Sequence, residues 1–215
     1  MLSPDTVSFL QDLAANNNRE WFKANDKRYK QDLKVPAEIF ADALAAEMSE
    51  ALGAETTFKV FRIYRDIRFS KDKTPYQTYL RIVVSEANRA PDYPKWMMGL
   101  EQDKLVIGLG AFAWEKPTLA RYREWMDSEK GDALAEMLAE QLADGARLGS
   151  ADLKRVPPPY DADHRHGDLL RYKGLTVWFD HEDHAAAFGP DGPRNTAESL
   201  LRFRPVHDWF ARLTA

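Results

Sequence analysis

Positive charge is concentrated in one short part of this chain. Residues 62–80 read RIYRDIRFSKDKTPYQTYL. Positions 59–73 hold six lysines and arginines against two acids, so they carry +4 in a chain of formal net charge −4, and the other 200 residues sum to −8. The basic residues are Lys59, Arg62, Arg65, Arg68, Lys71 and Lys73. Because guanidinium groups are planar, two-pronged donors, the pattern favours recognition of phosphate or carboxylate.

Aromatic and apolar side chains alternate with these cations, which favours a pocket rather than a solvated charged surface. Pockets for small ligands combine a few convergent polar groups with apolar walls. We therefore expect a pocket for an anionic, for example phosphorylated, small molecule. The candidate ligand-binding residues are Arg62, Tyr64, Arg65, Asp66, Arg68, Lys71, Lys73, Tyr76, Arg171 and Lys173. An internal arginine–aspartate network that orders a loop explains the same residues, and this alternative stays open.

The stretch SKDKTPY, residues 70–76, has the composition of an ordered turn. Thr74 followed by Pro75 is typical of a helix N-cap and first helical position. A helix N-terminus flanked by Lys71 and Lys73 would attract an anion. A capped turn without a ligand fits the spacing equally, and no phosphate-binding lysine motif or dinucleotide glycine pattern is present.

A second polar cluster, DADHRHGDLLRYKGL, occupies residues 161–175. Histidine and carboxylate side chains are metal ligands in many proteins, but the loop-like neighbours of His164 and His166 favour solvated histidines, so we predict no metal site. We expect this block to fold back onto residues 62–76, with both lining one pocket. If catalysis occurs there, His164 is the candidate proton-transfer group, because imidazole titrates near neutral pH.

Composition excludes several classes of protein. A hydrophobic content of 44% with 30% charged residues is that of a globular protein. No apolar run approaches a membrane span, and the N-terminus has no signal-peptide pattern, so we expect a cytoplasmic protein with no membrane partner. The absence of cysteine excludes disulfides and thiolate chemistry. Overall acidity argues against a general nucleic-acid coat protein, and neither a cofactor nor an oligomeric state can be inferred.

The expected elements describe one α+β domain over residues 1–215. We predict helices from Pro4, after Asn18 and from Pro36 to Gly53, strands over 57–64 and 80–85, and a hairpin of 95–100 with 104–111. Further helices are expected over 117–130 and 132–142, with a strand over 175–179 and a helix after Asn195. Gly108 and Gly110 indicate close approach by another group, most often an aromatic ring. Helices, a mostly antiparallel sheet and further helices give the α+β class.

Three blocks of this sequence resemble a known family. FLQDLAANNNREWFKANDKRY, KVFRIYRDIRFSKDKTPYQTYL and DHRHGDLLRYKGL are similar to the signatures of an uncharacterised bacterial and fungal family, the domain of unknown function 2461. The resemblance covers nearly the whole chain. It departs from the family pattern at Gln77, where lysine is expected, and at Arg165, where proline is expected. It implies a single cytoplasmic α+β domain and supplies no activity.

Three functions compete for the basic segment. The first is a binding module or enzyme with a pocket for an anionic small molecule. The second is an interaction protein in which the arginines are internal scaffolding. The third is single-stranded nucleic-acid binding, with arginine and aromatic rings as stacking surfaces. We rank the three in this order, so nucleic acid is not the expected partner. We predict that Arg62, Arg65 and Arg68 are mostly buried or pocket-facing and paired, with Asp66 the nearest candidate partner. We also expect Trp21 to pack close to this basic stretch.

Overall fold

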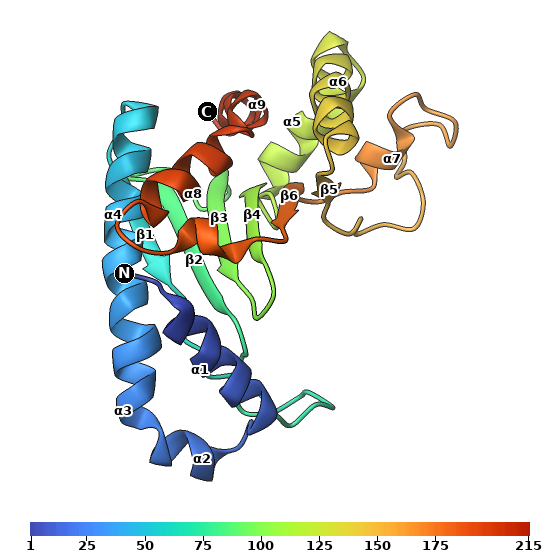
Figure 1. Ribbon diagram of the computed structural model, residues 1–215. Helices are drawn as coiled ribbons and strands as arrows, with labels where there is room; N and C mark the ends of the chain where they lie inside the picture. Colours follow the sequence, from blue (N-terminus) through green and yellow to red (C-terminus); the bar gives the residue numbers. More distant parts are fainter. The chain divides into compact units, whose positions relative to one another are not determined.

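The computed structural model describes residues 1–215 and has the expected α+β architecture (Figure 1). The helices are α1 (Pro4–Ala15), α2 (Arg19–Ala24), α3 (Asp26–Arg28), α4 (Val35–Leu52), α5 (Lys116–Met126), α6 (Glu129–Ala143), α7 (Gly167–Leu170), α8 (Gly192–Leu201) and α9 (Arg204–Leu213). A π-helical turn spans Tyr29–Lys34, and a 3₁₀ turn spans His184–Ala187. None of the helices combines the length and apolar character needed to cross a membrane.

Six strands form an antiparallel sheet in the order β1-β2-β3-β4-β6-β5. They are β1 (Thr56–Val60), β2 (Leu80–Glu86), β3 (Lys95–Leu100), β4 (Leu105–Gly110), β5 (Arg147–Leu148) and β6 (Thr176–His181). The hairpin expected around residues 101–103 is confirmed, and the Glu101 amide donates to the Lys104 carbonyl at 2.9 Å.

The residues group into two compact units. The first contains Met1–Ala87, Met97–Ile107 and Asp180–Ser199. The second contains Asn88–Trp96, Gly108–Phe179 and Leu200–Ala215. The expectation of one domain over residues 1–215 stays a prediction.

The N-terminal helices begin and end where the sequence indicates. Ser3 precedes α1 in a capping box with Thr6, and Pro4 occupies its first turn. The asparagines at 16–18 separate α1 from α2, and the Asn18 side chain accepts a hydrogen bond from the Trp21 amide, as expected of an N-cap.

The helix expected to start at Pro36 is instead the continuation of a longer helical run. α3, the π-helical turn and α4 follow one another without a break from Asp26 to Leu52. Pro36 lacks an N–H, and it lies just after the junction between the π and α segments, where the hydrogen-bond spacing changes. Gly53 ends α4 with a φ of 65°, in the left-handed region that glycine adopts without strain.

In the first unit, α4 packs against β1 and β2 (Figure 1). Thr56 pairs with Glu86 and Val60 pairs with Ile82. Buried and half-buried residues alternate along β2, as a strand with one face on the core requires. The strand expected over 57–64 ends at Val60, so the following basic residues lie in a loop rather than in the sheet.

In the second unit, both strand glycines receive a close neighbour. The Trp178 ring lies against Gly108, where an added Cβ would come within 2.3 Å of Cε3. The Leu175 carbonyl oxygen would lie 2.0 Å from a Cβ at Gly110, which has a φ of +133°. The expected aromatic contact is therefore found at Gly108, whereas backbone makes the contact at Gly110.

We predict that Gly108→Ala destabilises the protein, because the added methyl group displaces the Trp178 ring. The expected loss in the free energy of unfolding is about 1–3 kcal/mol, the usual cost of overpacking a core. Urea denaturation measures it. In a Trp178→Leu background the same substitution should cost less, and an equal cost in both backgrounds would contradict the contact.

Candidate functional site

Residues 61–79 join β1 to β2 and are here called the basic loop. They form a long connection that extends away from the sheet (Figure 1). Tyr64 and Tyr76 form an isolated antiparallel bridge at its base. The Arg65 amide donates to the Pro75 carbonyl at 2.9 Å, and the Gln77 amide donates to the Ile63 carbonyl at 2.6 Å. Residues 75–77 therefore pair back onto 63–65. The helix expected to start at Thr74–Pro75 does not form, and the predicted helix N-terminal anion site is wrong.

Asn17 fastens the basic loop to the N-terminal helices. Its side-chain amide donates to the Tyr76 carbonyl at 2.9 Å, and its Oδ1 accepts from the Tyr76 amide at 3.1 Å. Tyr76 is buried, so without Asn17 both backbone groups would lack these partners. The asparagine run thus ends one helix, caps the next and holds a loop that lies 59 residues further along the chain.

Aromatic rings fill the space beneath the basic loop. Phe22 stacks on Tyr76 with ring centroids 4.2 Å apart and meets Tyr64 edge-on at 5.7 Å. Trp21, which we expected close to the basic stretch, packs on Phe9 with ring centroids 5.9 Å apart. The side chain of this helix that contacts Tyr64 is the neighbouring Phe22, because it lies on the buried face of α2.

Arg65 organises the interior of the basic loop. Its side chain is only 20% exposed and donates to the Asp72 carboxylate at 2.5 Å and to the Thr74 carbonyl at 3.0 Å. The Thr74 amide also donates to Asp72, at 2.9 Å. The Thr74 amide, followed by Arg65, lowers the pKa of Asp72 from 3.8 to about 2. The partner of Arg65 is therefore Asp72 and not Asp66.

Arg62 and Arg68 are exposed, so the expectation that they are buried is wrong. Arg68 is 76% exposed and pairs with Asp66 at 2.6 Å, which lowers the pKa of that carboxyl. Arg62 makes no ion pair. The reasoning fails because the loop leaves the sheet. Ile63 is buried, but the aromatic neighbours that should draw the arginines inward are themselves exposed, and Phe69 is 95% exposed. Lys71 is exposed and unpaired, and the Lys73 ammonium donates to the Ile67 carbonyl at 3.0 Å.

Residues 161–167, here called the histidine loop, attach to the start of α6. His164 Nδ1 accepts from the His166 amide at 3.0 Å, so its proton lies on Nε2, which donates to Asp127 at 3.2 Å. His166 Nε2 lies 2.7 Å from the Asp132 carboxylate. The hydrogen bond from His166 lowers the pKa of Asp132, and Arg165 contributes further.

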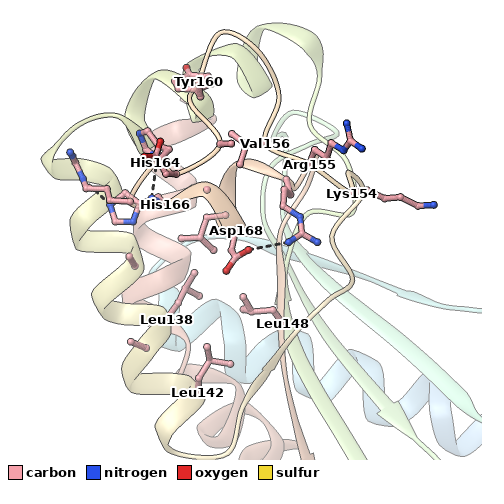
Figure 2. Close-up of a pocket in the computed structure, with 18 residues that line it drawn as sticks. Leu138, Leu142, Leu148, Lys154, Arg155, Val156, Tyr160, His164, His166 and Asp168 are labelled. Carbon is pink, nitrogen blue, oxygen red and sulfur yellow. Dashed lines mark hydrogen bonds and ion pairs between the residues drawn. The ribbon is translucent and has the colours of Figure 1, made fainter.

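A groove of about 830 Å³ lies between α6, the histidine loop and the segment around residues 148–156 (Figure 2). Figure 2 shows Leu138 and Leu142 on α6 facing Leu148 across an apolar floor. Cationic side chains also line the groove, namely Lys154, Arg155, Arg165 and Arg171. Asp163 and Asp168 are the acids among the lining residues, so cations outnumber anions there.

Arg171 is held in place, whereas Lys154 and Arg155 are not. Arg171 donates to the Leu153 carbonyl at 2.9 Å and pairs with Asp168 at 3.0 Å (Figure 2). Lys154 and Arg155 are exposed and make no ion pair. Lys173 is exposed, and its backbone amide donates to Asp152 at 2.7 Å. The groove therefore has two uncommitted cations at its rim, and Figure 2 shows both side chains pointing away from the apolar floor.

Of the predicted site residues, the groove brings together His164 and Arg171. The predicted residues between Arg62 and Tyr76 lie in the first unit and these two lie in the second, so a single pocket lined by both blocks stays a prediction. Sequence reasoning missed Lys154 and Arg155. The signal was a pair of adjacent cations just before the three prolines at 157–159.

No group of three or more histidine, cysteine, aspartate or glutamate side chains is arranged to hold a metal ion. His164 and His166 have their Nε2 atoms on two different carboxylates, Asp127 and Asp132. What the arrangement can do chemically is bind: it presents cations beside an apolar surface.

Comparison with known proteins identifies a family without an assigned activity. The family model described as "Conserved hypothetical protein (DUF2461)" matches residues 5–209. No curated protein matches the chain significantly. The match covers nearly the whole length, as the resemblance of the three sequence blocks implied.

We predict that Asn17→Ala lowers the free energy of unfolding by about 2 kcal/mol, since two buried backbone groups of Tyr76 lose their partners. Denaturant unfolding measures the loss, and hydrogen exchange should rise over residues 61–79. Asn16→Ala is the matched control, because the Asn16 side chain bonds only to the Asp12 carbonyl of its own helix. Equal effects of the two substitutions would show that Asn17 does not hold the loop.

We predict that the Asp72 carboxyl titrates at about pH 2, against an ordinary value of 3.8. Because its pKa is depressed on folding, its contribution to stability is fully present above pH 3.8 and is lost as the pH falls towards 2. Carboxyl ¹³C chemical shifts followed against pH measure the midpoint. Arg65→Met should raise the pKa but leave it below 3.8, because the Thr74 amide still donates, whereas Arg62→Met should leave it unchanged.

Proposed function

This chain belongs to the DUF2461 family of conserved hypothetical proteins. Since that description assigns no activity, we propose a function from the structure: the protein binds an anionic small molecule in the groove beside α6. The observation that carries the proposal is the pair of exposed, unpaired cations, Lys154 and Arg155, at a groove that also contains Arg171. Cations without carboxylate partners remain available to a ligand, and a phosphate or carboxylate group satisfies their donors.

The floor of the groove supports a ligand larger than an inorganic ion. Leu138, Leu142 and Leu148 contribute apolar surface (Figure 2). A volume of about 830 Å³ falls within the usual range for small-molecule sites. The expected ligand therefore joins an anionic group, attracted by the excess of cations around the groove, to an apolar or aromatic part, which the leucines cover.

His164 is the candidate proton-transfer group of this site if the protein is an enzyme. It lines the groove, but both ring nitrogens are engaged, with the His166 amide and with Asp127. Proton transfer to a ligand therefore requires one of these bonds to open. Binding needs no such change, and for this reason we propose a binding function and assign no reaction.

We predict that calorimetric titration reveals binding of AMP, whose adenine supplies the aromatic part, and weaker binding of glucose 6-phosphate and citrate, which have no apolar part. The double substitution Lys154→Glu/Arg155→Glu should weaken that binding at least about tenfold, because hydrogen bonds between charged groups contribute about 1.5–3 kcal/mol each. Lys116→Glu is the matched control, since Lys116 is an exposed lysine of the same unit that does not line the groove.

Two outcomes would contradict the proposal. One is that none of the three anions binds to the unmodified protein. The other is that the double variant and the Lys116→Glu control bind equally well, which would place the binding site elsewhere on the molecule.

A further inference from the structure

The basic loop carries three aromatic rings that the core does not bury. Phe69 is 95% exposed, Tyr64 is 49% exposed and Phe61 is 43% exposed. Isolated exposed apolar residues are common on protein surfaces, but a fully exposed phenylalanine gains nothing from folding. Three rings on one loop of 19 residues provide flat apolar surface to a partner.

Of these three exposed rings, the first and the last in sequence each have a cation beside them. The Lys59 ammonium lies 4.8 Å from the centroid of the Phe61 ring, and the Arg68 guanidinium lies 5.9 Å from that of Phe69. Arg62 and Lys71 are exposed on the same loop and make no ion pair. The two acids, Asp66 and Asp72, are occupied by Arg68 and Arg65. The loop therefore presents unneutralised positive charge between and beside its rings.

The basic loop is also built to hold its shape. The Tyr64–Tyr76 bridge and the Asn17 amide close its base, and the Arg65–Asp72 pair ties its two sides together. Lys73 donates to the Ile67 carbonyl across the turn. A surface that is ordered before binding loses less conformational entropy when a partner arrives.

From these contacts we propose that the basic loop is a docking surface for single-stranded nucleic acid. Unpaired bases stack on aromatic side chains, while the phosphates beside them attract lysine and arginine. Duplexes are disfavoured because their bases are already stacked on one another. The Tyr64 ring packs edge-on against Phe22, so it is held against the protein and cannot insert freely into a bilayer. A ring held in this way can still stack with a base, which favours nucleic acid over a membrane as the partner.

The charge of the rest of the chain limits how such binding works. The residues outside 59–73 sum to −8, so their net charge disfavours a polyanion, and the proposed contact is the basic loop together with the adjacent Lys59. Binding through a few phosphate contacts falls steeply as salt is added. The inference is independent of the small-molecule groove, which lies in the second unit and whose cations this test leaves unchanged.

The test is fluorescence anisotropy of a labelled oligothymidylate of about 15 nucleotides, long enough for one binding surface. The full-length protein should bind it at low salt. Phe69→Ala should weaken binding at least about fivefold, the loss expected when one stacking ring is removed. Phe112→Ala is the matched control, because Phe112 is 72% exposed but lies in the second unit, and it should leave binding unchanged.

The salt dependence separates the two kinds of contact. Arg62→Gln and Lys71→Gln should each reduce the slope of log affinity against log salt by about 0.7, the value for one phosphate contact on a single strand. Phe69→Ala should lower the affinity and leave the slope unchanged. A duplex of the same length should bind more weakly than the single strand.

Three results would overturn the inference. They are absence of oligothymidylate binding at low salt, equal effects of Phe69→Ala and Phe112→Ala, and binding to phosphatidylserine vesicles that depends on Phe69 while the oligonucleotide does not bind. The last result would identify a membrane surface as the partner. None of them would affect binding of AMP, glucose 6-phosphate or citrate in the groove.

Discussion

The basic loop depends on the two hydrogen bonds between the Asn17 side chain and the backbone of Tyr76. A chain that leaves a sheet must find partners for its backbone groups, and where Tyr76 is buried water supplies none. One amide side chain satisfies both the N–H and the C=O of Tyr76. Phe22, five residues after Asn17, stacks on the Tyr76 ring, so a single short segment holds both the backbone and the side chain of the same residue.

The second unit holds the histidine loop by a similar device. Asp127 and Asp132 flank the start of α6 and bond to His164 and His166, respectively. In both units, polar side chains near helix ends fix a loop that is distant in sequence. Carboxylates that bond to a loop in this way, such as Asp127 and Asp132, are not available to pair with lysine or arginine elsewhere. An acidic chain can thereby present unpaired cations in each of its two units, such as Arg62 in the first and Lys154 in the second.

Local patterns predicted the elements whose ends have local causes. Pro4, Asn18 and Gly53 set helix boundaries through their own dihedral angles and capping groups, and they stand where expected. The pattern at Thr74–Pro75 is as suitable for a helix, yet none forms, because Tyr76 pairs with Tyr64 and Asn17 instead. The contact between Asn17 and Tyr76 joins residues 59 positions apart, so the sequence around Thr74 gives no sign of it. This contact outweighs the local preference for a helix start. The burial of Arg62 and Arg68 was misjudged for the same reason, since their position in a loop rather than a strand is set by that contact.

The basic segment posed a choice between a binding site and internal scaffolding, and the contacts assign some of its residues to scaffolding and give the others no internal role. Arg65 is scaffolding: it is largely buried, and Asp72 and Thr74 use its donors. Arg62, Lys71 and Phe69 contribute nothing to the interior, and exposed groups of this kind do not stabilise a fold. The scaffold residues hold the exposed ones at set positions, which a flexible loop of the same composition would not do. Sequence alone could not make this division, because an arginine that ties a loop together and one that faces outward are the same residue type in the same pattern.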